Sequence, residues 1–369
     1  MRNMIYLFIL LLVGLLYGSQ NYEADLENLL KDNPNQAEKI KEIWDKCPMK
    51  WQKQMMFLLN SMPDIDLAEV DAEFMLNTIE QSERTKGAFV WAKFIPEHIY
   101  LQNVLPFRVT QEPLEDWKDF FYEKLYPIVK DTKTIEQAAI KVNYWCSEKI
   151  KFKQTERRDQ GPFETYKSGY GRCEEMVIFF VAALRSVGIP AREAATPYWP
   201  HTDNNHAWTE IWTENGWKYT GAAEPKDSLN SAWFTKTVNK AALVYSYGMG
   251  NVDTNEEIYR KKEKYTIINS TANYRTTGIL QIDFSNFPND AEKQSYISVF
   301  NFSALRPIAR VVADTTTNIG KITMGEGDYF VSANIHNKAV WSIATIKNDE
   351  TTKLQFSNFK NPEEFKLWY

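Results

Sequence analysis

The stretch that decides the fold reads SGYGRCEEMVIFFVAALRSVGIPAR and covers residues 168–192. Its apolar run is continuous from Met176 to Leu184, and Gly188 and Pro190 follow it. Glycine and then proline just beyond an apolar run are the usual signal for the end of a helix. We therefore predict a strong helix here, with Cys173 in its first turn.

A cysteine at the start of a helix meets two needs of catalysis. The helix N-terminus presents unpaired backbone N–H groups and a partial positive charge, which favour thiolate over thiol. Such positions can lower a cysteine pKa to about 3.5–7.5. The same N–H groups are suited to an oxyanion, and Gly169 and Gly171 would let a substrate backbone approach closely. The pattern predicts that Cys173 is a nucleophile, with Tyr170 either donating to the oxyanion or packing.

A second motif, NNHAWTEIWTENGWKYTG, covers residues 204–221 and places His206 at the start of a predicted strand. Alternation along that strand puts His206, Trp208 and Glu210 on one face. A cysteine on a helix start that faces a histidine on a packed strand is the nucleophile–base arrangement of papain-like enzymes. We favour this interpretation over a buried, inert Cys173, because the histidine follows in the right order.

Together these segments resemble the core of the transglutaminase-like superfamily. The resemblance rests on GRCEE (171–175), LRSVGIPAR (184–192), HAWTEIW (206–212) and the following Trp217. GRC before an acidic residue is similar to the peptide N-glycanase branch, and a looser similarity to transglutaminase-domain proteins of Bacteroidetes-type bacteria covers most of the chain. The resemblance implies an α+β fold: a helical N-terminal region, a papain/transglutaminase-like core with the cysteine-bearing helix on an antiparallel sheet, and a C-terminal β-sandwich. It also implies thiol acyl transfer without a metal or an organic cofactor.

One position departs from the family pattern. The family usually places an aspartate four residues after the tryptophan, and here that position is Gly221. Glu224, which matches the glutamate of a GACEP-like family variant, becomes the expected third catalytic residue if the strand ends near Ala222. Asp203 is the alternative acid, and a backbone carbonyl is the third possibility.

The rhythm of apolar residues divides the rest of the chain. Helical spacing dominates before residue 150, and short alternating strands with polar turns begin near residue 277. We expect a helical region over 20–150, the core over 151–270 and a β-sandwich over 271–369. Cys146 lies on an apolar helix face and Cys47 at a helix end, so both are interpreted as structural.

Composition excludes several classes of partner. The chain has 369 residues, a net charge of -5 and no basic block, which argues against nucleic acid. The cysteines and histidines form no metal-binding motif, and we expect neither a metal nor another cofactor. An apolar run over 4–18 is too short for a comfortable membrane span, so residues 1–19 are predicted to be a signal peptide. We therefore expect an exported protein, periplasmic or secreted, with no stable membrane span after signal removal.

The sequence thus predicts an exported cysteine enzyme that acts on peptide or carboxamide bonds, with Cys173, His206 and Glu224 as its catalytic residues. Its expected substrate is a peptide, a protein or a glycopeptide. Hydrolysis is the preferred outcome, and amine transfer remains open. The alternative is a catalytically degenerate protein that binds peptide or glycan.

Overall fold

In the computed structural model, the stretch around Cys173 forms helix α11 (Cys173–Ser186), as the sequence predicts. Arg172 precedes it in an extended conformation as the N-cap, so Cys173 is the first helical residue. From its third residue to its end, every side chain of the helix is buried. Gly188 follows with a left-handed φ of 73°, a conformation that strains residues with a Cβ.

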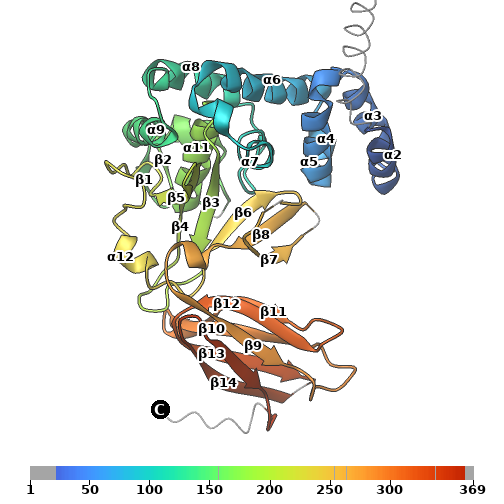
Figure 1. Ribbon diagram of the computed structural model, residues 1–369, viewed down its shortest axis with the longest axis vertical. Helices are drawn as coiled ribbons and strands as arrows, with labels where there is room; N and C mark the ends of the chain where they lie inside the picture. The colour runs from blue at the N-terminus through green and yellow to red at the C-terminus, as the bar shows by residue number, and fades with distance from the viewer. Residues whose placement is uncertain (1–21, 157, 253, 263, 337, 362–369) are drawn as a thin grey trace, which may run out of the picture. The chain divides into compact units, whose positions relative to one another are not determined.

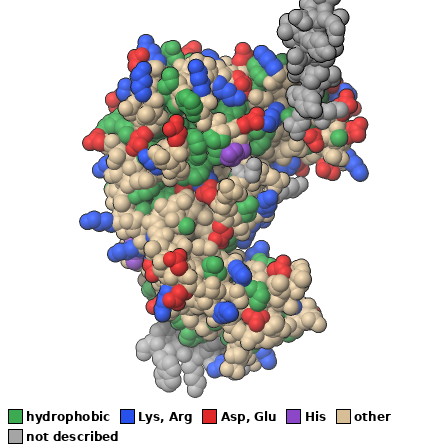
Figure 2. Space-filling model, viewed as in Figure 1, with side chains coloured by type: hydrophobic (Ala, Val, Ile, Leu, Met, Phe, Trp, Pro, Cys, Tyr) green, Lys and Arg blue, Asp and Glu red, His purple; other side chains and the backbone are tan. Residues whose placement is uncertain are grey.

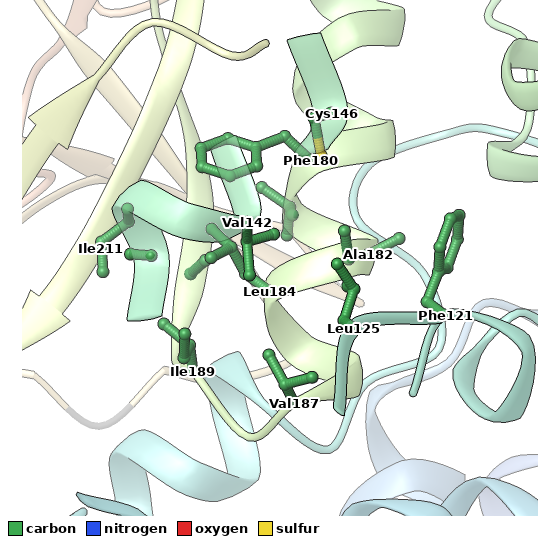
Figure 3. Close-up of a cluster of buried hydrophobic side chains, with 14 of the residues drawn as sticks. Phe121, Leu125, Val142, Cys146, Phe180, Ala182, Leu184, Val187, Ile189 and Ile211 are labelled. Carbon is green, nitrogen blue, oxygen red and sulfur yellow. The ribbon is translucent and has the colours of Figure 1, made fainter. Parts of the chain in front are cut away.

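Helix α11 packs against three helices and two strands. These are α8 (Lys118–Val129), α9 (Ile135–Lys149), α10 (Pro162–Ser168), β3 (Ala191–Thr196) and β4 (His206–Thr213). Figure 3 shows the cluster they form, which includes Phe121, Leu125, Val142, Cys146, Phe180, Leu184 and Ile211, each of them 0% exposed. Truncating a buried phenylalanine to alanine costs about 3–5 kcal/mol. The cluster therefore fixes α11 firmly on the sheet, and Cys146 is the buried apolar residue that the sequence predicts.

A six-stranded antiparallel sheet carries the second half of the site. Its order is β5–β4–β3–β6–β8–β7, with β5 (Gly216–Thr220), β6 (Tyr245–Met249), β7 (Glu257–Lys261) and β8 (Tyr265–Asn269) (Figure 1). Strand β3 pairs with β4 so that Thr196 lies opposite His206. Along β4, Ala207 belongs to the cluster under α11, whereas Trp208 belongs to a second cluster on the other face.

The chain before this core is helical, as predicted. The structure describes residues 22–361 apart from 157, 253, 263 and 337, and the chain divides into two compact units between residues 79 and 80. The first unit contains α2 (Glu23–Asp32), α3 (Ala37–Asp45), η1 (Met49–Trp51), α4 (Gln52–Ser61) and α5 (Asp64–Glu69), and α6 (Ala72–Ala88) crosses the division. The second unit continues with η2 (Trp91–Phe94), α7 (Glu97–Asn103), the paired strands β1 (Lys151–Phe152) and β2 (Tyr170–Gly171), and later α12 (Thr235–Val238) and η3 (Thr271–Asn273). The expected signal peptide, residues 1–19, lies outside the described residues.

The C-terminal region is a β-sandwich, also as predicted. One sheet has the order β11–β10–β13–β14 and the other β12–β9–β15 (Figure 1). The strands are β9 (Thr277–Asp283), β10 (Gln294–Asn301), β11 (Ala304–Val312), β12 (Ile319–Gly325), β13 (Gly327–Ile335), β14 (Lys338–Ile346) and β15 (Thr351–Gln355). Pairing is antiparallel except that β15 runs parallel to β9. The apolar cluster between the sheets also takes in Leu243 and Tyr245, which precede the sandwich in the chain. The expected domain boundaries at 150 and 270 remain predictions.

The surface carries charges of both signs. Figure 2 shows Lys and Arg side chains interspersed with Asp and Glu over the visible face. Across the described ranges, no helix has both the length and the apolar character needed to cross a membrane.

Candidate active site

Cys173 lies where helix α11 meets the start of strand β4. The backbone N–H groups of Ala207 and Glu174 lie near its sulfur and favour the thiolate. The thiol in turn donates to the Oε2 atom of the Glu174 carboxylate, at 3.2 Å. Since Ala207 directly follows His206, the contact to its amide places the sulfur beside the first residue of β4.

The protonation state of Cys173 differs from the sequence expectation. Burial, together with the charge and the hydrogen bond of Glu174, raises the pKa of the thiol to about 12, although the two backbone N–H groups act in the opposite direction. The prediction of a lowered pKa is therefore wrong for the ligand-free chain. Loss of water around the sulfur and an adjacent carboxylate outweigh the field of the helix N-terminus.

His206 is held by aromatic rings. Its imidazole centroid lies 4.7 Å from the ring of Phe234 and 5.0 Å from that of Trp233, and Trp208 is 5.9 Å away. Burial lowers the pKa of His206 to about 4, against a smaller opposing effect of Glu174. Its Nε2 atom is buried and has no hydrogen-bond partner among the described residues. The ligand-free site thus holds a neutral imidazole beside a neutral thiol.

One cavity of about 570 Å³ brings the three predicted catalytic residues together. Cys173, His206 and Glu224 all line it, with Phe152, Gln154, Arg172, Glu174, Met176, Asn204, Asn205, Ala207, Ala222 and Trp233. The cavity is large enough to accept a side chain and the adjoining backbone of a peptide. In the portions of the chain that the structure describes, no group of three or more His, Cys, Asp or Glu side chains is placed to hold a metal ion.

Glu224 reaches this cavity through a tight turn. Strand β5 ends at Thr220, and an isolated antiparallel bridge then joins Gly221 to Glu224, with Ala223 at a left-handed φ of 54°. The Glu224 Oε2 atom lies 2.5 Å from the place that a Cβ on Gly221 would occupy. The carboxylate therefore takes the space of the side chain that position 221 lacks.

The hydrogen bond of Glu224 goes to a residue that the sequence analysis did not single out. Trp233 Nε1 donates to its Oε2 at 2.7 Å, and the same indole packs on the His206 ring. Trp233 thus links the carboxylate to the imidazole, although 61% of its surface is exposed. Burial raises the pKa of Glu224, which the hydrogen bond from Trp233 and the charge of Lys226 partly offset. Trp233 lies in the segment SAWF (231–234), and its closeness in the chain to the predicted acid was the available signal.

Asp203, the alternative acid, points elsewhere. Its Oδ1 atom accepts a hydrogen bond from the backbone N–H of Phe302 at 2.6 Å. Phe302 belongs to the turn between β10 and β11 of the sandwich. Asp203 therefore anchors the loop before His206 to the sandwich, and it is not among the residues that line the cavity.

The two glutamates after Cys173 have different surroundings. Glu174 faces the sulfur, whereas Glu175 is 0% exposed and accepts hydrogen bonds from Thr155 Oγ1 at 2.8 and 2.7 Å and from the backbone N–H of Arg172 at 2.7 Å. Glu175 thus caps the helix and ties the preceding loop to it.

The two glycines before Cys173 shape the start of the helix. Gly169 ends α10 with a left-handed φ of 74°, and a Cβ on Gly171 would lie 2.9 Å from the Cβ of Glu175.

Tyr170 lies outside the catalytic cavity. It lines a separate hollow with Lys153 and Arg158, and the Lys153 ammonium lies 4.3 Å from the centre of its ring. Of the two roles considered for Tyr170, packing fits this position.

Two solved structures are distantly similar to this chain. A candidate cysteine protease from Cytophaga hutchinsonii is 15% identical, with 51% of this chain and 68% of that chain covered at a TM-score of 0.29. A candidate protease from Parabacteroides distasonis is 11% identical, with 78% of this chain and 54% of that chain covered at a TM-score of 0.28. No curated protein matches the chain. Likenesses this remote carry no inference about the site.

The family comparison is specific to the region that carries the cysteine and the histidine. The family model described as the transglutaminase-like superfamily matches residues 124–220, from within α8 to the end of β5. Both Cys173 and His206 fall inside the match, and Glu224 lies just beyond it. Residues 124–220 are thus similar to the transglutaminase-like superfamily, and the match contains both the Cys173 and the His206 motifs.

Proposed function

We propose that this chain is a cysteine enzyme that cleaves peptide or carboxamide bonds through a thioester on Cys173. The observation that carries the proposal is the shared cavity, in which Cys173 meets the first two residues of β4 through the amide of Ala207. The match of residues 124–220 to the transglutaminase-like superfamily supports the same chemistry.

In the proposed reaction, neutral His206 takes the proton from the thiol as the sulfur attacks the substrate carbonyl carbon. The oxyanion of the tetrahedral intermediate forms beside the backbone N–H groups at the start of α11. The imidazolium then gives its proton to the leaving amine, the C–N bond breaks, and a thioester remains. Water attacks the thioester as His206 accepts its proton, and the C–S bond breaks to release the acid and regenerate the thiol.

Glu224 is proposed as the residue that orients His206. Its carboxylate fills the space beside Gly221, on the strand next to β4, and it is joined through Trp233 to the imidazole. A carboxylate there would stabilise the imidazolium that forms during the reaction. The role assigned to Glu224 is therefore electrostatic and positional.

Hydrolysis is the proposed outcome, with a peptide, protein or glycopeptide as the substrate. Water reaches an open cavity more readily than a scarce amine does, so amine transfer is the second outcome to be measured. We also propose that the protein is exported, on the basis of the apolar run near the N-terminus. N-terminal sequencing of the protein from cell envelopes checks this, because retention of Met1 in a membrane-bound form would contradict signal cleavage.

A second function is favoured by one observation. A thiol with a pKa near 12 and a family aspartate replaced by Gly221 are what a degenerate, ligand-binding relative would show. Such a protein would bind peptide or glycan in the same cavity without turning it over.

Activity profiling decides between the two functions. The mature chain is incubated with peptide and glycopeptide libraries beside Cys173→Ala and His206→Ala, and products are read by mass spectrometry. Cys47→Ala is the matched thiol control, because Cys47 does not line the cavity. Turnover that disappears only in the first two variants supports the enzyme. Binding without turnover, unchanged in Cys173→Ala, supports the degenerate protein.

A further inference from the structure

The loop over residues 197–205, which leads into His206, is held by a side chain of the sandwich, Asn301. Asn301 is the last residue of β10 and is 0% exposed. Its Nδ2 atom donates to the backbone carbonyls of Trp199 at 2.9 Å, Thr202 at 2.9 Å and Asn204 at 3.3 Å. Its Oδ1 atom accepts from the backbone N–H of Asn204 at 3.1 Å. A single amide therefore satisfies polar groups at both ends and in the middle of the loop.

The hairpin after Asn301 adds a second attachment. Phe302 and Ser303 have φ values of 48° and 57°, so they form the left-handed two-residue turn that suits the twist of paired strands. This turn directs the N–H of Phe302 toward the Asp203 carboxylate, which accepts it at 2.6 Å. The loop is thus bound to the sandwich by both a buried amide and a charged acceptor.

Trp199 anchors one end of the loop by stacking on Trp208, whereas the end next to His206 depends on polar contacts. Asn204 adopts a left-handed φ of 93°, which costs about 1–3 kcal/mol for a residue with a side chain unless its surroundings enforce it. One backbone bond closes the loop on itself, from the Trp199 N–H to the Asn204 carbonyl at 3.1 Å. Asn301 bonds to the same two residues, so it stabilises both the strained residue and the closure.

This loop forms a wall of the catalytic cavity. Asn204 and Asn205 line the cavity, and His206 follows them directly. The position of the loop fixes where β4 begins, and with it the Ala207 amide that contacts the Cys173 sulfur. A change at Asn301 would therefore act directly on Asn204, two positions before His206.

We infer that Asn301 is a positioning residue for His206, so that the C-terminal sandwich is an integral part of the active site. The expected effect of Asn301 on catalysis rests on the proposed function, whereas its expected effect on the position of the imidazole does not. Without the Asn301 amide, the carbonyls of Trp199 and Thr202 lose this donor and draw in water, and the Asn204 carbonyl keeps only its bond from the Trp199 N–H. The loop then opens and the imidazole becomes hydrated.

The test follows the titration of His206 in the full chain by NMR of labelled histidine, with His206→Gln to assign the signal. Asn301→Ala removes the amide, and Asn301→Asp keeps an acceptor but loses the donors to the three carbonyls. Burial holds the pKa of His206 at about 4, so both variants should move it toward 6.5. They should also lower kcat/KM at least tenfold, mostly through kcat, because a misplaced base slows chemistry more than binding.

The matched control is Asn286→Ala. It removes another bond of a sandwich asparagine to backbone, the one from Asn286 to the Phe356 carbonyl, which is remote from the loop. This control should lower the melting temperature without changing the His206 titration. If Asn301→Ala does not fold, Asp203→Ala carries the same test, since it removes only the exposed contact to Phe302.

The outcomes separate this inference from the proposed function. An unchanged His206 titration in Asn301→Asp and Asp203→Ala would overturn the positioning role, whatever the activity. A shifted titration in a chain that never turns over substrate would support the positioning role and reject the proposed enzyme. A shift equal to that of Asn286→Ala would show a general loss of stability and would also overturn the inference.

Discussion

Gly221 and Glu224 lead to a prediction that depends on the shape of one turn. A Cβ on Gly221 would lie 2.5 Å from Glu224 Oε2 and 3.0 Å from Glu224 Cβ. Real Cβ atoms do not come so close to other atoms, so Gly221→Ala must push the Glu224 carboxylate aside. The displaced carboxylate also loses its bond from Trp233. Gly221→Ala should therefore behave like a Glu224 variant.

The size of the effect follows from the proposed role of the carboxylate. Losing an orienting acid beside a thiol nucleophile should lower kcat/KM roughly 10- to 100-fold, which is about 1.4–2.7 kcal/mol of transition-state stabilisation. We expect this loss in Glu224→Gln, Glu224→Ala and Gly221→Ala. In the Glu224→Ala background the space beside Gly221 is empty, so adding Gly221→Ala should cost less than about twofold. The coupling free energy between positions 221 and 224 should therefore be nearly as large as the loss of transition-state stabilisation in either single variant.

A transplanted acid makes the test sharper. Gly221→Asp in the Glu224→Ala background returns a carboxylate to the position where the family usually has aspartate, and it should recover most of the lost kcat/KM. The assay is steady-state turnover of the best library peptide, with melting temperature measured for every variant. Gly87→Ala is the matched control, because a Cβ there meets nothing within 4 Å.

Two results would refute this reasoning. If Gly221→Ala slows turnover equally in both backgrounds, the two residues are not competing for one space. If Glu224→Ala is as active as the unmodified chain while Cys173→Ala is inactive, Glu224 has no part in catalysis.

Other predictions concern charge. Burial and Glu174 raise the pKa of Cys173, so Glu174→Gln should shift its iodoacetamide labelling to lower pH, and an unchanged labelling profile would contradict this. Neutral His206 is the proposed base and its pKa is lowered to about 4, so kcat/KM should fall only below about pH 4; an acidic limb near pH 6.5 would show an unburied imidazole. Glu193 is buried with a raised pKa, and its Oε2 atom has no hydrogen-bond partner among the residues that the structure describes. Its contribution to folding stability is lost as pH rises, so Glu193→Gln should match the unmodified chain at pH 4 and exceed it in chemical denaturation at pH 8. Glu210, a buried glutamate on the next strand, is instead paired with Arg192, so Glu210→Gln should destabilise the chain by about 3–5 kcal/mol by breaking a buried ion pair.

The parts of the site that the sequence predicts are the ones encoded locally. The apolar run and its closing glycine determine α11, and the alternation after His206 determines β4, because each pattern records which side of one element is buried. The turn at Gly221 was also within reach, since a small-residue segment followed by an acid suggested an early strand end. The structure shows that turn, and its effect on catalysis remains a prediction.

The parts that the sequence could not supply depend on distant elements. The high pKa of Cys173 arises from how thoroughly the sheet and the helices exclude water from its sulfur, which no local pattern records. Asn301 lies 95 residues after His206 in the chain, on a strand of the C-terminal sandwich where a polar residue has no periodic signal. Its role becomes visible only when the loop and the hairpin are placed side by side.

The two pKa values constrain how the proposed reaction begins. With the thiol near 12 and the imidazole near 4, moving a proton from sulfur to His206 in the ligand-free site costs about 11 kcal/mol. Attraction between the resulting charges returns only about 4 kcal/mol for a pair about 4 Å apart in a partly polar site. A preformed thiolate–imidazolium pair is therefore negligible at rest. The proton must leave the sulfur as the C–S bond forms, and a substrate that draws the Glu174 carboxylate away from Cys173 would lower the barrier.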